Sequence, residues 1–164
     1  MEPNSLELEL PSDWSAVKAV WDPCRAMLRG AGLGEDEAYA LAMVSQELLE
    51  NAVKYGARDG GGIALSLRVD RDDVVVEVRS RVGVDDEHLR AFDRTVQWIR
   101  GHQNPFEAYV ERLKQVAVQP YLPGQSGLGL ARIAYEARCA LDFYVDAGST
   151  LAVSAVYRRE GAEQ

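Results

Sequence analysis

Residues 63–81 read IALSLRVDRDDVVVEVRSR, and this stretch decides the fold. Its apolar residues alternate with polar ones or are β-branched, which predicts two strands, Ile63–Val69 and Val74–Arg81. The polar link Asp70–Asp73 is short enough for a tight turn, so the two strands are expected to form a hairpin. Consecutive strands of this kind argue against a doubly wound parallel sheet, in which strands and helices alternate.

Three further strands are expected near the two ends of the chain. Ser5–Leu10 alternates leucine with polar residues, which is typical of a half-buried strand. Ala140–Val145 and Leu151–Tyr157 are expected to pair through a turn at Ala147–Gly148. Because each predicted pair of neighbouring strands is a hairpin, we expect an α+β two-layer sandwich. Its sheet would be mixed and largely antiparallel, with helices on one face.

Helical periodicity covers most of the remaining sequence. A helix is expected from about Trp14, with a kink or break at Pro23, because proline disturbs a helix interior. Glu35–Tyr55 is the clearest helix, since its acidic first turn suits the helix dipole and its apolar residues recur at helical spacing. A weaker helical pattern covers about residues 82–124, and another helix is expected from about Ser126 to Arg138.

Length and charge limit the possible functions. The 164 residues predict a single domain over residues 1–164, with a helical insertion or lid at about 82–124. The net charge of −8 at pH 7 argues against a protein that coats DNA or RNA, because such proteins need a basic face. An acidic surface suits a cytosolic protein or one whose partner is basic.

Cysteine, histidine and apolar patterns exclude further classes. The two cysteines and two histidines are not clustered, so neither a structural zinc site nor a disulfide framework is expected. The first residues lack the pattern of a signal peptide, and no apolar run approaches the roughly 18 residues of a membrane span. The sequence therefore predicts a cytoplasmic protein without a membrane segment.

One edge of the long predicted helix is a candidate site. Glu47, Asn51 and Lys54 are spaced i, i+4 and i+7, so they share one face beside the apolar stripe. A carboxylate and an amide oxygen one turn apart could hold a hydrated Mg²⁺ or a water molecule. The alternative is a solvated helix face without any ligand.

A glycine-rich loop is the second candidate. Residues 124–130 read GQSGLGL, and a helix is expected to begin within them. Free backbone N–H groups and the positive end of a helix dipole suit a phosphate, and closely spaced glycines let the backbone approach it. The loop is neither a Walker A motif nor a Rossmann fingerprint. Its alternative interpretation is a simple loop and helix cap.

Together the two motifs resemble those of the GHKL ATPase superfamily, which has the Bergerat ATP-binding fold. Residues 45–55, SQELLENAVKY, resemble its N-box, and residues 126–130, SGLGL, resemble its second glycine box. The order of strands and helices is also similar over nearly the whole chain. The short length looks most like the stand-alone anti-sigma-factor serine kinases of the RsbW and SpoIIAB type. A small helical insertion before Gly-Leu-Gly-Leu resembles the divergent SiaB-type protein kinases.

The resemblance implies cofactors and a role for each matched residue. ATP and Mg²⁺ would be bound, with Glu47 as the general base that orients an acceptor hydroxyl or water. Asn51 would ligate Mg²⁺, and Lys54 would lie near the phosphates as a charge partner. The loop residues Ser126, Gly127, Leu128 and Gly129 would cover the phosphates. Such roles suit phosphoryl transfer, which depends on positioning and charge neutralisation.

The first glycine box of the superfamily, D-x-G-x-G after a strand, is degenerate here. In that superfamily the aspartate binds the adenine amino group. The resemblance places Ser80 at the position of this aspartate and leaves Gly83 as the remaining glycine. A serine hydroxyl could accept one hydrogen bond from adenine, but without a carboxylate's charge. Arg79 and Arg81 share one face of the preceding strand, which would be either solvent-facing or close to the phosphates.

Three functions are therefore weighed. The first is a regulatory Mg–ATP-binding protein, a serine/threonine kinase acting on a small regulatory protein or a sigma-factor-like partner in a partner-switching circuit. The second is a degenerate, non-catalytic protein of the same fold that acts only by binding other proteins. The third is a structural α+β domain in which both motifs are accidental. The resemblance also implies a possible homodimer.

Overall fold

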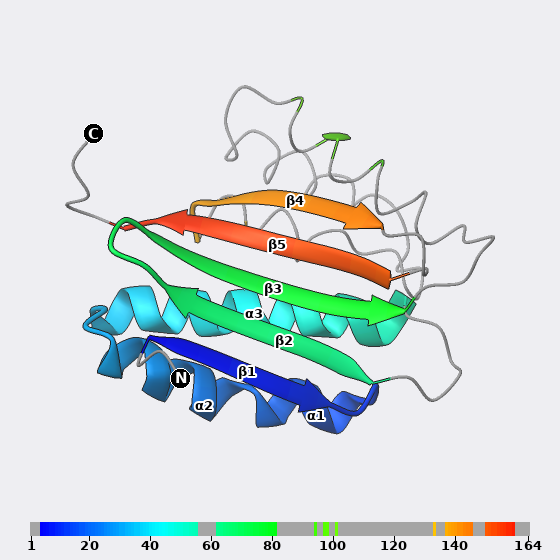
Figure 1. Cartoon of the computed structure of the whole chain (residues 1–164), viewed down its shortest axis with the longest axis horizontal. Coiled ribbons are helices and arrows are strands. Elements are labelled where there is room, and N and C mark those ends of the chain that lie inside the picture. Colours follow the sequence, from blue (N-terminus) through cyan, green and yellow to red (C-terminus); the bar gives the residue numbers. More distant parts are fainter. Residues whose placement is uncertain are drawn as a thin grey trace, which may run out of the picture.

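The computed structural model describes residues 4–55, 62–81, 94, 97, 98, 101, 133, 137–145 and 150–159. Within them, one sheet lies over a layer of helices (Figure 1). The elements along the chain are β1 (Ser5–Leu10), α1 (Trp14–Ala19), α2 (Trp21–Gly30), α3 (Glu35–Tyr55), β2 (Ile63–Val69), β3 (Asp73–Arg81), β4 (Cys139–Val145) and β5 (Thr150–Arg158).

The sheet has five strands in the order β1-β2-β3-β5-β4, and every neighbouring pair is antiparallel. This arrangement confirms the α+β expectation and makes the described sheet wholly antiparallel. The β2–β3 hairpin is also confirmed, because Val69 pairs with Val74 across the turn. Within that turn, the Asp70 N–H donates to the Asp73 carbonyl at 2.8 Å.

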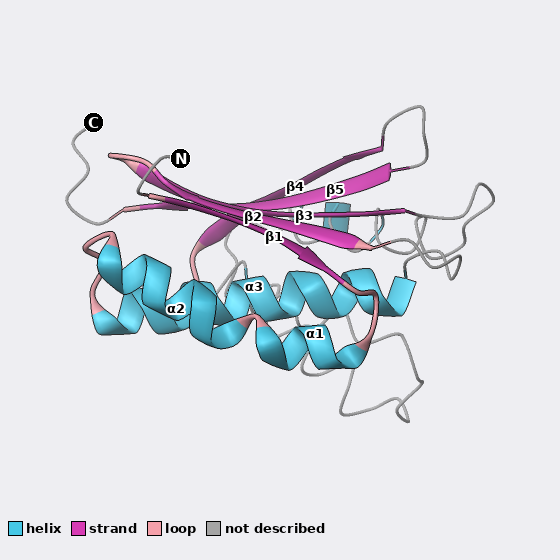
Figure 2. Cartoon of the chain, turned by 60° about the horizontal axis from the view of Figure 1, so that its bottom comes forward, coloured by secondary structure: helices cyan, strands magenta, loops and turns pink. Residues whose placement is uncertain are grey.

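The two faces of the sheet have different surroundings. Residues of β3 alternate in burial, with Val74, Val76 and Val78 buried against the helices. The three helices lie on that one face, as Figure 2 shows, and α3 packs mainly beneath β3. The opposite face of the sheet carries exposed side chains such as Arg68 and Arg79. Alternate side chains along each strand thus point to opposite faces, one set into the core and the other to the open face.

The first helical segment differs from the expectation at Pro23. The break lies at Val20, which ends α1 and precedes α2, rather than at the proline itself. Pro23 is then the third residue of α2, where its missing N–H costs nothing, because the first N–H groups of a helix have no intrahelical partner. A break at Val20 also relieves the clash that the proline ring would make with the carbonyl of Ala19.

The end of the last predicted helix is also corrected. Ile133 is helical and fully buried, but Ala137 and Arg138 are not helical. Arg138 has a φ of 54°, a left-handed conformation that cannot continue a right-handed helix. In the predicted insertion, Arg94, Gln97, Trp98 and Gly101 are helical, and the other residues of 82–124 lie outside the described residues, as does the turn expected at residues 147–148.

Candidate functional site

A contact between β5 and α3 defines how the long helix lies under the sheet. The hydroxyl of Tyr157 donates a hydrogen bond of 2.7 Å to Oε2 of Glu37, in the first turn of α3. Tyr157 pairs with Val74, near the start of β3. The beginning of α3 therefore lies beneath the beginning of β3, and Figure 1 shows the helix running along the sheet from there.

This arrangement brings Asn51 and Ser80 to the same level of the fold. From Glu37, α3 rises about 21 Å to Asn51 at 1.5 Å per residue. From Val74, β3 advances about 20 Å to Ser80 at about 3.3 Å per residue. Ser80 is 6% exposed and lies on the helix-facing side of β3, in register with Leu151. Asn51 and Ser80, which belong to separate sequence motifs, thus lie near the same end of the space between α3 and the sheet.

The candidate residues on α3 share one edge of the helix, and Asn51 lies farthest from α1. Gln46 lies on the α1 side, because its Nε2 donates to the carbonyl of Val17 at 3.0 Å. Asn51 projects roughly 140° round the helix from Gln46, and Glu47 and Lys54 lie on the same edge as Asn51. Glu47 is half-buried there. Asn51 therefore points away from α1, and Glu47 and Lys54 lie between its direction and that of Gln46.

The side chain of Asn51 is chemically unusual among the described residues. Its Nδ2 atom is buried and has no hydrogen-bond partner. A buried donor without an acceptor costs about 1–3 kcal/mol, so a native protein normally supplies a partner from the chain, from water or from a ligand. A phosphate oxygen is one acceptor that would satisfy Nδ2. The amide also carries an oxygen, the ligand type that Mg²⁺ prefers.

Lys54 has a partner that the sequence analysis did not identify. Its Nζ lies 3.9 Å from Oε1 of Glu50, one turn earlier on α3, and its side chain is 17% exposed. A glutamate four residues before a lysine is the favourable orientation for such a pair. The pair holds the Lys54 side chain against Glu50, one turn from the Asn51 edge.

The described residues carry no protein-only metal centre. No group of three or more histidine, cysteine, aspartate or glutamate side chains converges within the part of the chain that the structure describes. Mg²⁺ in phosphate-transfer sites is commonly held by one or two protein groups together with phosphate oxygens and water. The amide oxygen of Asn51 therefore fits a Mg²⁺ ion that takes its other ligands from phosphate and water.

Arg79 and Arg81 belong to the other side of the sheet. Both are exposed, and they alternate with the buried Val78 and Ser80. Arg79 donates to Oε1 of Glu77 at 2.6 Å and to the hydroxyl of Tyr144 at 2.9 Å. Of the two positions that the sequence left open, Arg79 and Arg81 therefore take the solvent-facing one. The sheet lies between them and Asn51.

The glycine motifs lie outside the described residues. These are Gly83 of the degenerate first box and Ser126, Gly127, Leu128 and Gly129 of the second. Their phosphate-binding role therefore stays a prediction from the sequence. The described part of the site consists of the Glu47, Asn51 and Lys54 edge together with Ser80.

Comparison with known proteins supports the fold. No protein-family model matches the chain, and no curated protein matches it. Among solved structures, it is similar to a chain of the SiaB–SiaC complex from Pseudomonas aeruginosa, with 19% sequence identity and a TM-score of 0.65. The match covers 94% of this chain and 89% of that one. None of the described helices is both long and apolar enough to cross a bilayer. At this level of identity, the likeness establishes a shared α+β architecture.

Proposed function

We propose that this protein is a regulatory Mg–ATP-binding protein that phosphorylates a serine or threonine of a small protein partner. One observation carries the proposal: the buried, unpartnered Nδ2 of Asn51 lies at the level of Ser80 and one turn from Glu47. A carboxylate, an amide and a cation on one helix edge match the needs of phosphoryl transfer, which are positioning and charge neutralisation.

Each residue has a distinct part in the proposed reaction. Mg²⁺ bound with ATP would neutralise charge on the phosphates. Asn51 would hold the metal–phosphate group through its amide, and the Lys54 side chain would lie near the phosphates as a charge partner. Glu47 orients the acceptor hydroxyl and accepts its proton during transfer. Ser80 would accept a hydrogen bond from the adenine amino group. Gly83 and residues 126–129 would enclose the nucleotide from the loops.

The proposed setting is a partner-switching circuit in the cytoplasm. The structural match is to a chain solved in a complex of two proteins, which supports a protein partner for this chain. The partner would be a small regulatory protein or a sigma-factor-like protein, and the proposal includes a homodimer. Light scattering of the purified protein over a range of concentrations tests the dimer.

Titration calorimetry with ATP, ADP and GTP, with and without Mg²⁺, tests nucleotide binding. Adenine nucleotides should bind, Mg²⁺ should strengthen ATP binding, and Asn51→Ala should remove that gain. Asp36→Asn is the matched control, since it changes an exposed residue at the opposite end of α3. Absence of binding at millimolar nucleotide would contradict the proposal.

Phosphate transfer needs a separate assay. Labelled ATP is incubated with the protein and a cell extract, and labelled proteins are then counted and identified. Glu47→Ala should abolish the labelling while nucleotide affinity is kept, because the base acts on the acceptor rather than on ATP. Equal labelling with wild type and Glu47→Ala would assign the signal to other kinases.

A second candidate is a non-catalytic protein of the same fold. The observation that favours it is Ser80, a neutral side chain where the resembling superfamily has a carboxylate. Under this alternative, wild type and Glu47→Ala are equally inactive and bind a protein partner with equal affinity. The two assays above therefore separate the candidates.

A further inference from the structure

Strand β1 forms one edge of the sheet, and its backbone directions can be assigned. The Val69 N–H donates to the carbonyl of Asn4 at 2.8 Å, so these two residues form a hydrogen-bonded pair in the β1–β2 ladder. Antiparallel pairs alternate between hydrogen-bonded and non-hydrogen-bonded. Leu6, Leu8 and Leu10 therefore direct their backbone groups toward β2. The N–H and C=O groups of Glu7 and Glu9 point outward from the sheet.

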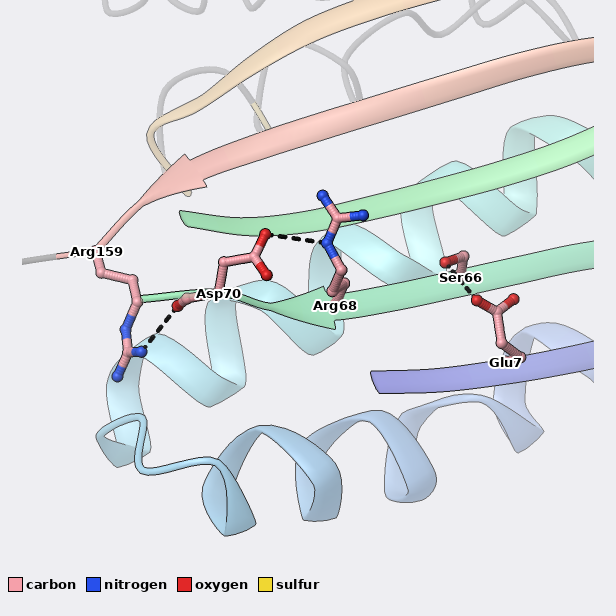
Figure 3. A network of polar contacts seen from close by, with 5 residues as sticks. All are labelled: Glu7, Ser66, Arg68, Asp70 and Arg159. Carbon is pink, nitrogen blue, oxygen red and sulfur yellow. Dashed lines mark hydrogen bonds and ion pairs between the residues drawn. The ribbon is translucent and has the colours of Figure 1, made fainter. Parts of the chain in front are cut away.

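The same two residues carry the charge at this edge. Both Glu7 and Glu9 are exposed and lie on the open face of the sheet. The Oγ of Ser66 on β2 donates to Oε1 of Glu7 at 2.9 Å, which holds that carboxylate above the sheet (Figure 3). Glu9 has no ion pair with any residue in the described ranges. The edge thus combines outward backbone groups with two carboxylates on one face.

The helix-facing side of β1 is incompletely covered. Leu6, Leu8 and Leu10 pack against the core, but each is only half-buried. A strand added outside β1 would place its alternate side chains beside these leucines and remove further apolar surface from water. A strand that pairs with β1 should therefore carry apolar side chains on the helix-facing side and basic side chains on the open face.

A second copy of this chain is a poor occupant of the edge. In a two-fold antiparallel pairing centred on Leu8, Glu7 of one copy lies opposite Glu9 of the other, twice over. Like charges directly opposite each other destabilise a strand pair. Exposed charges on edge strands also hinder pairing of identical chains. The occupant must carry the opposite charge.

The geometry points to β1 as a docking edge for an extended segment of a protein partner that alternates lysine or arginine with apolar residues. The partner's backbone pairs with the outward groups of Glu7 and Glu9. Its basic side chains lie opposite the two carboxylates, and its apolar side chains lie beside Leu8 and its neighbours. This docking needs no nucleotide and goes beyond the proposed catalytic function. Its failure would therefore not contradict the proposed kinase activity.

The test uses a short peptide that alternates valine and lysine, with a valine–glutamate peptide of equal length as its matched control. Binding is followed by NMR hydrogen exchange on the full chain without nucleotide. The lysine peptide should slow exchange of the Glu7 and Glu9 amides and leave the Leu8 amide unchanged, because Leu8 already bonds to β2. The glutamate peptide should protect neither amide.

Substitutions separate backbone pairing from charge attraction. Glu9→Gln and Glu9→Pro both remove the carboxylate, but proline also removes the outward N–H and is tolerated on an edge strand. Peptide affinity should be about tenfold weaker for Glu9→Pro than for Glu9→Gln, as expected for one lost hydrogen bond. The double change Glu7→Lys with Glu9→Lys should transfer binding to the glutamate peptide.

Three results would overturn the inference. One is an absence of binding by the lysine peptide at millimolar concentration. Another is binding that leaves the Glu7 and Glu9 amides unprotected, since this indicates attraction to the acidic surface alone. The third is protection of the same amides by rising protein concentration without peptide, because a second copy would then be the occupant.

Discussion

The hydroxyl of Tyr157 on β5 donates a hydrogen bond of 2.7 Å to Glu37 in the first turn of α3. The other carboxylate oxygen of Glu37 accepts from the Gly34 N–H at 3.2 Å, so this side chain links the helix start to the sheet. Because the residues are far apart in sequence, the contact sets the level of α3 beneath β3. With the pairing of β3 and β5, it brings Asn51 to about the same level as Ser80.

Replacing Tyr157 by phenylalanine should lower the free energy of unfolding by about 1–2 kcal/mol, since a partly buried hydrogen bond to a carboxylate is lost. Urea unfolding of wild type and variant measures the change. Tyr144→Phe is the matched control: that hydroxyl is on the exposed face, and its loss should cost under about 0.5 kcal/mol. An equal loss of unfolding free energy in the two variants would contradict a larger contribution from the Tyr157 hydrogen bond.

Asn51→Leu should stabilise the ligand-free protein by about 1 kcal/mol, because it removes a buried amide donor that has no partner. The same change should abolish the Mg²⁺-dependent gain in ATP affinity. Gln46→Leu offers the contrast, since it removes the donor to the Val17 carbonyl and should destabilise the protein. Thermal unfolding without nucleotide compares the two. If Asn51→Leu destabilised the protein as much as Gln46→Leu does, the Asn51 amide would have a partner within the ligand-free protein, which would contradict its proposed role in binding a ligand.

Ser80→Ala should weaken ATP binding by about three- to tenfold, the effect of losing one neutral hydrogen bond. The substitution is small and keeps the buried position filled, so the fold should persist. Ser66→Ala is its control on the open face of β2, and it should leave nucleotide affinity unchanged. Calorimetric titration with ATP distinguishes them. Unchanged affinity in Ser80→Ala would remove Ser80 from the proposed site.

Burial raises the pKa of the Cys139 thiol from 9.0 to about 12. The unfolded chain therefore loses this proton at lower pH than the folded chain does. The resulting contribution to stability is complete below pH 9 and declines as the pH rises from 9 toward about 12. Urea unfolding at increasing alkaline pH should show this fall, and Cys139→Ala should reduce its slope. An identical slope in the variant would assign the pH dependence to other groups.

Local patterns in the sequence predicted most of the described elements. The alternation in Ser5–Leu10 and in Ile63–Val69 matches β1 and β2, and the helical period of Glu35–Tyr55 matches α3. These predictions succeed because each pattern spans a whole element. The expectation at Pro23 placed the helix break three residues too late, since the chain can avoid a proline clash by ending the preceding helix earlier.

The sequence by itself determined which segments are strands and helices, and it put Glu47, Asn51 and Lys54 on one helix edge, because periodicity is a local property of the chain. Only the tertiary structure decided the order β3-β5-β4, the contact of Tyr157 with Glu37 and the burial of Nδ2 of Asn51 without a partner. It also turned Arg79 to the open face and left Glu7 and Glu9 on an edge strand. These properties depend on which distant segments pack together, and packing between distant segments is not encoded in any one local pattern.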